Sequence, residues 1–281
     1  MQAKNQFLLF LAIAITLNAI AQERLKGNKI VITQSRDITE FTSMEIKGDF
    51  DVYIFQGTTP FVTVETDENL QKAVNATIEG ETLKIELSER ISKSTKLKIF
   101  VTITNKLTKI AAYKNANIYA DTRIILKSLT INAFDNADFD MKIDADDFVI
   151  NGFKNTDLKF NTFSKDLKTL VSESCELKLE GEIDSLSTEI KNNGVLSIKG
   201  NGLKLAIDAK NNGTFKGDDF KVENAKINAN SRTNITVNVK DSIKINAEKN
   251  ASISIYNEPA IEIEKLEGKA KIYKKKPFKL F

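Results

Sequence analysis

Three acidic residues recur at one position of a short repeated pattern, and carboxylates placed in such a series could do chemistry. Asp138, Asp157 and Glu176 each follow a small residue and lie 19 residues apart. If the copies stack, their side chains form an acidic column with about 4.8 Å between neighbours. The column could bind calcium through its oxygens or supply the paired carboxylates that cleave glycosidic bonds. We favour a solvated face on which Lys159 and Lys178 neutralise the acids.

Two further groups invite a functional interpretation. Tyr113, Phe134 and Phe153 share another repeat position and predict an aromatic stack at a corner. An exposed stack could hold a sugar or a partner, but we favour packing at the corner. Cys175 falls in a row of small inward positions. We interpret it as a buried small hydrophobe, because the sequence has no imidazole that could activate a thiol nucleophile.

The composition narrows the possible chemistry. The chain has 281 residues, no His, no Trp and one Cys. The lack of His excludes Ser-His-Asp and Cys-His catalysis and histidine-ligated metals, and a single Cys excludes intrachain disulfides. A net charge of +3 argues against a nucleic-acid partner. We therefore assign no catalytic, cofactor-binding or metal-binding residue and expect a protein that is not an enzyme.

An internal repeat predicts the fold. Eight times a small residue opens an apolar/polar alternation, with a mean spacing near 19 residues. Alternation at period two predicts strands with one buried face, and a 19-residue unit cannot bury that face alone. We expect an all-β protein, a right-handed parallel β-helix (β-solenoid) of about eight 19-residue coils. The small residues are Ala116, Ala137, Thr156, Cys175, Gly194, Gly213, Thr233 and Ala251.

The residue before the small one is Asn in six of the eight repeats. Asn tolerates the left-handed backbone that a tight corner needs, and stacked amides can bond from coil to coil. We interpret the row as turn chemistry, with a row of sugar-binding amides as the alternative. Its members are Asn115, Asn136, Asn155, Ser174, Asn193, Asn212, Arg232 and Asn250.

The repeats belong to a single expected β-solenoid domain over residues 36–273, whose first third is less regular. Residues 22–35 are expected to be a polar lead-in and residues 274–281 a basic C-terminal tail. Alternating runs between Phe41 and Ile103 predict strands, separated by turns at Gln56-Gly57 and Glu79-Gly80. A short helix is expected from Thr66 to Val74, with Thr66 as its cap.

The N-terminal runs also carry a resemblance to a known family. Their pattern includes Phe41-x-x-Met44-x-Ile46-x-Gly48, Phe50-Asp51-Val52-Tyr53-Ile54-x-Gln56-Gly57, Val62-x-Val64-Glu65 and Glu79-Gly80-x-x-Leu83-x-Ile85. Over roughly residues 36–257 the chain resembles the putative auto-transporter adhesin, head GIN domain family, although that family usually has Gly near Ala112 to Ala116. The resemblance implies an exported β-helical protein of unassigned molecular role. It carries over no functional residue.

The first 21 residues predict a signal peptide. Lys4 precedes an apolar run over residues 7–17, and Ala19-Ile20-Ala21 offers the small residues that signal peptidase reads. The run is too short to cross a bilayer, which needs about 20 residues, so we expect no transmembrane span in the mature chain. Cleavage near Ala21 would leave an extracytoplasmic protein, located in the periplasm, at the outer-membrane surface or outside the cell.

These features together predict an exported cell-envelope β-solenoid that serves as a non-enzymatic binding or adhesion module. A surface glycan or an envelope protein is the expected partner. One alternative is a carbohydrate-active enzyme, a polysaccharide lyase or hydrolase, that uses the outward carboxylates. Another is an assembly protein whose open solenoid ends pair with other chains.

Overall fold

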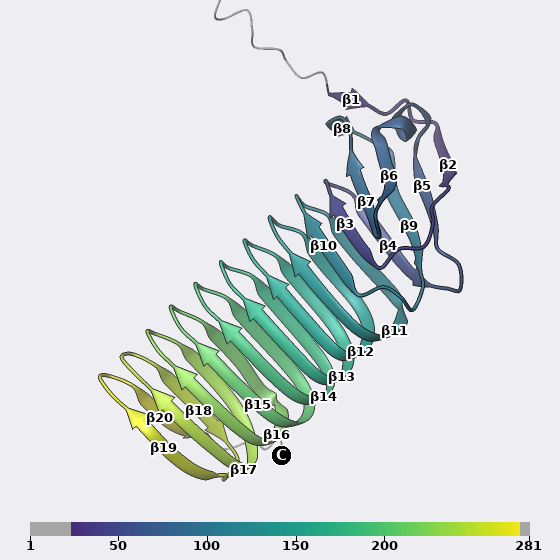
Figure 1. Ribbon diagram of the computed structural model, residues 1–281. Coiled ribbons are helices and arrows are strands. Elements are labelled where there is room, and N and C mark those ends of the chain that lie inside the picture. Colours follow the sequence, from purple (N-terminus) through teal and green to yellow (C-terminus); the bar gives the residue numbers. More distant parts are fainter. Residues whose placement is uncertain (1–23, 276–281) are drawn as a thin grey trace, which may run out of the picture.

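The computed structural model describes residues 24–275, which fold almost entirely into β-strands stacked along a rod (Figure 1). The expected signal peptide and residues 276–281 of the expected tail lie outside the described residues. Eighteen strands form one sheet, and β1 (Leu25–Lys26) pairs separately with β8 (Ile91–Lys93). Within residues 24–275, no helix has the length and apolar character that a membrane crossing requires.

The repeats form the coils of the rod, which confirms the predicted β-solenoid, with about nine turns. Equivalent residues pair in parallel from coil to coil, as Phe148 pairs with Leu167 and Leu167 with Leu186. Because the first part of β17 pairs with β18 and its second part with β19, each long strand serves both faces of the rod. The long strands are β11 (Asn117–Ala133), β12 (Asp138–Gly152), β13 (Asp157–Val171), β14 (Glu176–Ile190), β15 (Val195–Ala209), β16 (Thr214–Ala229) and β17 (Asn234–Ala247).

The interior consists of ladders of equivalent side chains. The predicted inward positions are buried in every coil. Among their polar residues, the Thr169 hydroxyl donates to the Thr188 hydroxyl at 2.7 Å, whereas the Thr233 hydroxyl has no partner among the described residues. Each fully buried Leu, Ile or Phe contributes about 1.5–3 kcal/mol. That gain exists only when a neighbouring coil covers the side chain. One ladder contains Leu129, Phe148, Leu167, Leu186, Leu205, Ala225 and Ile243.

The corners of the coils are two-residue turns. Asp135 (φ 53°) and Asn136 (φ 61°) both have positive φ, and the Ala137 amide donates to the Phe134 carbonyl at 3.1 Å. This geometry is a type I′ turn, which favours Asn. The predicted amide ladder is also present, because the Asn136 side chain donates to the Asn115 side-chain oxygen at 3.0 Å. The turn interpretation of the Asn row is confirmed.

A second bend was not identified from the sequence. It lies within the long strands at Gly181 (φ 146°) and Gly200 (φ 127°). A Cβ atom on Gly200 would stand 1.8 Å from the Gly181 carbonyl oxygen. Two coils approach so closely here that only glycine fits.

The N-terminal third extends both faces and then closes the rod. Parallel pairing continues through β10 (Lys109–Tyr113), β3 (Ser43–Lys47) and β7 (Thr82–Leu87) on one face, and through β4 (Asp51–Gln56) and β9 (Leu97–Ile103) on the other. Beyond these strands the pairing becomes antiparallel. The added strands are β5 (Phe61–Asp67), β2 (Val31–Arg36) and β6 (Val74–Glu79). The segment expected to be a polar lead-in therefore contains β1 and β2.

The short helix differs from its prediction. It is a 3-10 helix, η1 (Glu68–Ala73), and Thr66 is not its cap. Thr66 lies in β5, where its hydroxyl donates to the Lys96 carbonyl at 2.8 Å, so it is unavailable to the helix. Leu70 and Ala73 of η1 are buried, and the helix packs against β2, β5 and β6.

The C-terminal end has a different construction. After β17 the chain forms three short strands, β18 (Ser252–Tyr256), β19 (Ala260–Leu266) and β20 (Lys271–Lys275). β19 continues one face and β20 continues the other. The first two residues of the expected tail, Lys274 and Lys275, therefore lie in β20.

A buried carboxylate anchors the N-terminal cap. Asp67 accepts hydrogen bonds from the Lys29 amide at 2.6 Å, the Thr95 amide at 2.6 Å and the Thr95 hydroxyl at 2.9 Å. Burial by itself raises the pKa of Asp67, but the donors from Thr95 and Lys29 outweigh it and hold the pKa below its ordinary value. The charge thus joins three segments that are distant in sequence.

The inward phase of the strands can be tested at two adjacent residues of β14. Leu186→Asp buries a charge between two coils, and we expect a loss of about 4 kcal/mol or more in the free energy of unfolding. Ser187→Asp, on the exposed side, should change that free energy by less than about 0.5 kcal/mol. Urea unfolding followed by circular dichroism measures both. Equal losses for the two variants would show that the phase is wrong.

The Asp67 anchor makes a pH-dependent prediction. Asp67→Asn leaves backbone donors of the cap poorly paired and should cost about 1–3 kcal/mol of stability at pH 7. Because the folded pKa is depressed, the wild-type advantage is complete above the unfolded value, near 3.9, and disappears as the pH falls through the folded value. Glu68→Gln, at the neighbouring exposed carboxyl, is the control and should be nearly neutral. A wild-type advantage that persists unchanged at pH 2 would contradict this account.

Candidate functional site

The acidic column lies on the surface, as the sequence predicted, and two lysines lie beside its carboxylates. Asp138 accepts the Asp157 backbone amide at 2.8 Å. Lys178 lies 3.7 Å from Asp157 and 3.3 Å from Glu176, and Lys159 lies 3.6 Å from Asp157. The lysines therefore neutralise the column, and this arrangement supports neither a hydrolase nor a lyase. Within residues 24–275, no three His, Cys, Asp or Glu side chains are grouped closely enough to hold a metal ion.

The predicted aromatic stack exists at a corner of the rod. Tyr113, Phe134 and Phe153 stack with ring centroids 5.1 Å apart and planes within 8° of parallel. The Lys47 ammonium covers the outer face of Tyr113 at 5.5 Å from the ring centroid. All three rings are half-buried. Since each inner ring face is taken by the next ring, the stack packs the corner and leaves mainly ring edges to solvent.

The row that begins with these rings changes character along the rod. We call the positions three residues before each small residue the corner row. Toward the C-terminus its side chains become polar and charged, and they remain half-buried in most coils. Its members are Tyr113, Phe134, Phe153, Ser172, Lys191, Lys210, Asn230 and Glu248.

A second outward row runs beside it along the margin of one face. We call it the margin row, and its register follows the strand pairing. Asn228 and Asn246 bond within it, with the Asn246 amide donating to Asn228 at 3.1 Å. The C-terminal half of the row contains Glu189, Asp208, Asn228, Asn246 and Lys265.

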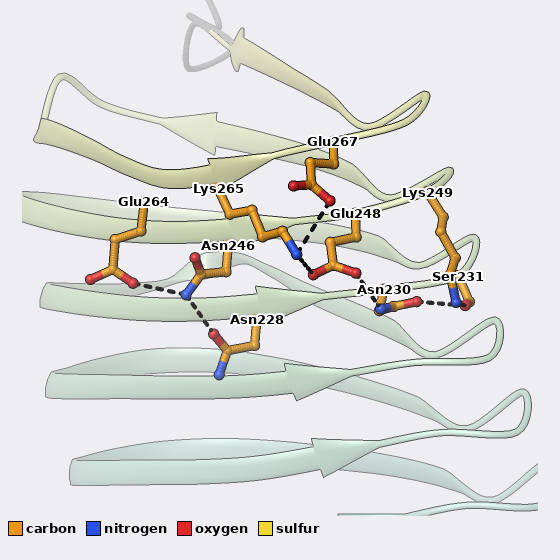
Figure 2. Close-up of polar contacts among 9 residues, drawn as sticks. All are labelled: Asn228, Asn230, Ser231, Asn246, Glu248, Lys249, Glu264, Lys265 and Glu267. Atoms are coloured by element: carbon orange, nitrogen blue, oxygen red, sulfur yellow. Dashed lines mark hydrogen bonds and ion pairs between the residues drawn. The ribbon is translucent and has the colours of Figure 1, made fainter.

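The two rows meet at a polar hollow over β15, β16, β17 and β19 (Figure 2). Its volume is about 530 Å³. Within it Asn230 donates to Glu248 at 3.0 Å, and Lys265 donates to the other Glu248 oxygen at 2.6 Å. Figure 2 shows these side chains on one side of successive coils, directed toward one another. Each side chain is therefore held in place by the coil above or below it.

The hollow contains both acidic and basic side chains and has a net charge of only +1, from Lys210, Lys249 and Lys265 against Asp208 and Glu248. The hydrogen bond from Lys265 lowers the pKa of Glu248 below its ordinary value. In β14, one coil before the hollow begins, Glu189 contacts Lys191 at 2.8 Å and Lys210 at 3.1 Å. These two lysines lower the pKa of the Glu189 carboxyl below its ordinary value. Both carboxylates stay ionised at neutral pH. The surface offers amides, carboxylates and ammonium groups together and has no dominant sign.

Sequence reasoning missed this hollow. It followed the corner row only as far as Phe153, where the aromatic residues end. The recurrence of Lys191, Lys210, Asn230 and Glu248 at the same repeat position was the available signal. Their meeting with the margin row required the strand register, which only the fold supplies.

Cys175 is confirmed as an interior residue. It is fully buried, and burial raises the pKa of its thiol to about 11 despite the opposing effect of Thr156. A thiol with that pKa is almost entirely protonated at neutral pH and is a poor nucleophile. A Cβ on Gly152, in the neighbouring coil, would lie 2.3 Å from its sulfur, which shows how closely this row is packed.

Comparison with solved structures identifies the same fold in bacterial proteins. A putative adhesin from Parabacteroides merdae superposes with a TM-score of 0.68 at 20% identity, covering 90% of this chain and 99% of its own. A putative adhesin from Parabacteroides distasonis gives 0.67 at 17%, covering 90% and 100%. A putative lipid binding protein from the same species gives 0.61 at 19%, covering 90% and 99%. These likenesses establish the fold.

No curated protein matches the chain. A family model does match, over residues 40–162 and 150–259, and its description is putative auto-transporter adhesin, head GIN domain. The matched segments include most of the N-terminal strands and all of the corner and margin rows except Lys265. The chain belongs to the putative auto-transporter adhesin, head GIN domain family.

Proposed function

We propose that this protein is an exported, non-enzymatic adhesion module that binds a surface glycan along the corner and margin rows. Cleavage near Ala21 would release it to the extracytoplasmic side of the cell. The observation that carries the proposal is the polar hollow at Asn230 and Glu248. The family membership and the fold shared with proteins described as putative adhesins support a binding role.

The chemistry of the hollow suits a hydroxylated ligand. Amides both donate and accept hydrogen bonds, as sugar hydroxyls do. Asp208 and Glu248 offset two of the three lysines Lys210, Lys249 and Lys265, and the remaining single positive charge is small for recognition of a polyanion such as nucleic acid. A ligand with many neutral hydroxyls meets no repulsion here.

The rigidity of the rod adds to this fit. Coil-to-coil bonds, such as that from Asn230 to Glu248, already fix the side chains, so binding needs little further ordering. The rows also repeat at the coil spacing of about 4.8 Å. An extended glycan could engage several coils at once, and weak contacts would combine into useful avidity.

Two asparagines with equivalent coil-to-coil bonds allow a matched test. Asn230→Leu removes a bond to Glu248 (3.0 Å) inside the hollow, and Asn201→Leu removes a bond to Glu182 (2.9 Å) away from it. We expect Asn230→Leu to weaken glycan binding about five- to tenfold, as expected for one lost hydrogen bond. Asn201→Leu should bind like the wild type.

The measurement is a glycan array with the chain starting at Gln22, followed by titration of the strongest bound glycan. Equal affinities for the two variants would place the ligand elsewhere on the rod. If no glycan on the array binds, and an envelope protein is captured by the wild type but not by Asn230→Leu, the partner is that protein and not a glycan. Turnover of a polysaccharide would overturn the non-enzymatic assignment.

A further inference from the structure

The apolar interior of the rod is open at its C-terminal end. Ile261, Ile263 and Leu266 of β19 continue the inward ladders of Ile243, Ile245 and Ala247. The three residues of the preceding coil are fully buried, whereas those of β19 are 48–50% exposed. Within residues 24–275, nothing covers these side chains. The last coil thus presents the surface that every other coil buries.

The backbone at this end is open as well. β19 pairs with β17 and β20 pairs with β18, and among the described strands neither has a neighbour on its other edge. Figure 1 shows both strands at the end of the rod that is away from the N-terminal strands. Unpaired edges of this kind readily add another strand. An apolar patch bordered by two free edges is typical of an interface.

The opposite end cannot serve as the complement. There the pairing has turned antiparallel through β5 and β6, whose Val62, Val64 and Val74 belong to the buried interior. A head-to-tail filament would need the two ends to match. If the C-terminal end of one copy can bind only the C-terminal end of another, the contact is isologous and the assembly stops at a dimer.

The charges of the two edge strands select one arrangement. β19 carries Glu262, Glu264 and Lys265, so its net charge is negative, and β20 carries Lys271, Lys274 and Lys275 and no acid. Within the chain, Glu262 already pairs with Lys244 and Lys274 with Glu258. A two-fold axis that placed β19 against its own copy would bring acids against acids and lysines against lysines. An axis that places β19 against β20 of the second copy brings acids beside lysines, which favours that register.

We propose that two copies of this chain associate end to end through their C-terminal coils, with β19 of each pairing antiparallel with β20 of the other. The contact covers Ile261, Ile263 and Leu266 and joins two rods into one of double length. Each dimer then displays two sets of the corner and margin rows. The proposal does not depend on which ligand those rows bind.

The association can be measured by sedimentation velocity on the chain starting at Gln22. We expect a dimer, and we expect Ile263→Glu to raise the dissociation constant at least tenfold. Leu203→Glu, at an equally exposed residue on the bend near Gly202 (45%), is the control and should remain dimeric. A monomer at 100 µM, or a series of growing oligomers, would overturn the proposal.

Cysteine crosslinking tests the register with variants that keep the apolar patch intact. Under mild oxidation, a mixture of Glu262→Cys and Tyr273→Cys chains should give a disulfide-linked dimer, whereas Glu262→Cys alone should not. Cys175 does not interfere, because it is fully buried. Crosslinking of Glu262→Cys with itself would overturn the proposed pairing.

A truncation distinguishes between two possible occupants of the open C-terminal end, a second copy of the chain and residues 276–281 of the same chain. Removing residues 276–281 should leave the dimer intact. A full chain that is monomeric, with a truncated chain that dimerises, would show that those six residues cover the end. That result would overturn the proposal.

Discussion

Coil-on-coil burial of the inward ladders is the interaction on which the rest of this structure depends. A single coil has one apolar side and no second layer to cover it, so Leu167 is buried only because Phe148 and Leu186 lie directly above and below it. Register and burial are therefore one requirement, since a slip by one residue would turn the ladder outward. The same requirement leaves the two ends of the rod as its weak points, because each end coil has only one neighbour.

The protein treats its two ends differently. At the N-terminal end, antiparallel strands cover the interior, and the Asp67 carboxylate ties the cap together. At the C-terminal end the last described coil remains open, with acidic and basic edge strands on its two faces. The contrast suggests that one end serves folding and the other serves association.

Between the ends, the outer surface is free to vary, because the inward ladders alone maintain the stack. The corner row changes from stacked rings at Phe134 to a charged network at Glu248, while both corners keep the backbone hydrogen bond that closes the turn, from Ala137 to Phe134 and from Ala251 to Glu248. A regular scaffold thus carries different chemistry along its length. Such an arrangement suits a module that binds by surface complementarity, for which rigid and repeated contacts matter more than a deep cavity.

The sequence alone determined the solenoid, the inside and outside of each repeat and the tight corners with left-handed backbone, since period-two alternation and the Asn positions depend on local chemistry. It misplaced the helix cap at Thr66, and it missed β2 and the polar hollow. Those features depend on contacts between residues distant in sequence, such as Thr66 with Lys96 and Asn230 with Glu248. Only the tertiary structure decided them, because a repeat pattern specifies what faces inward but not which outward side chains meet, nor how the first and last coils end.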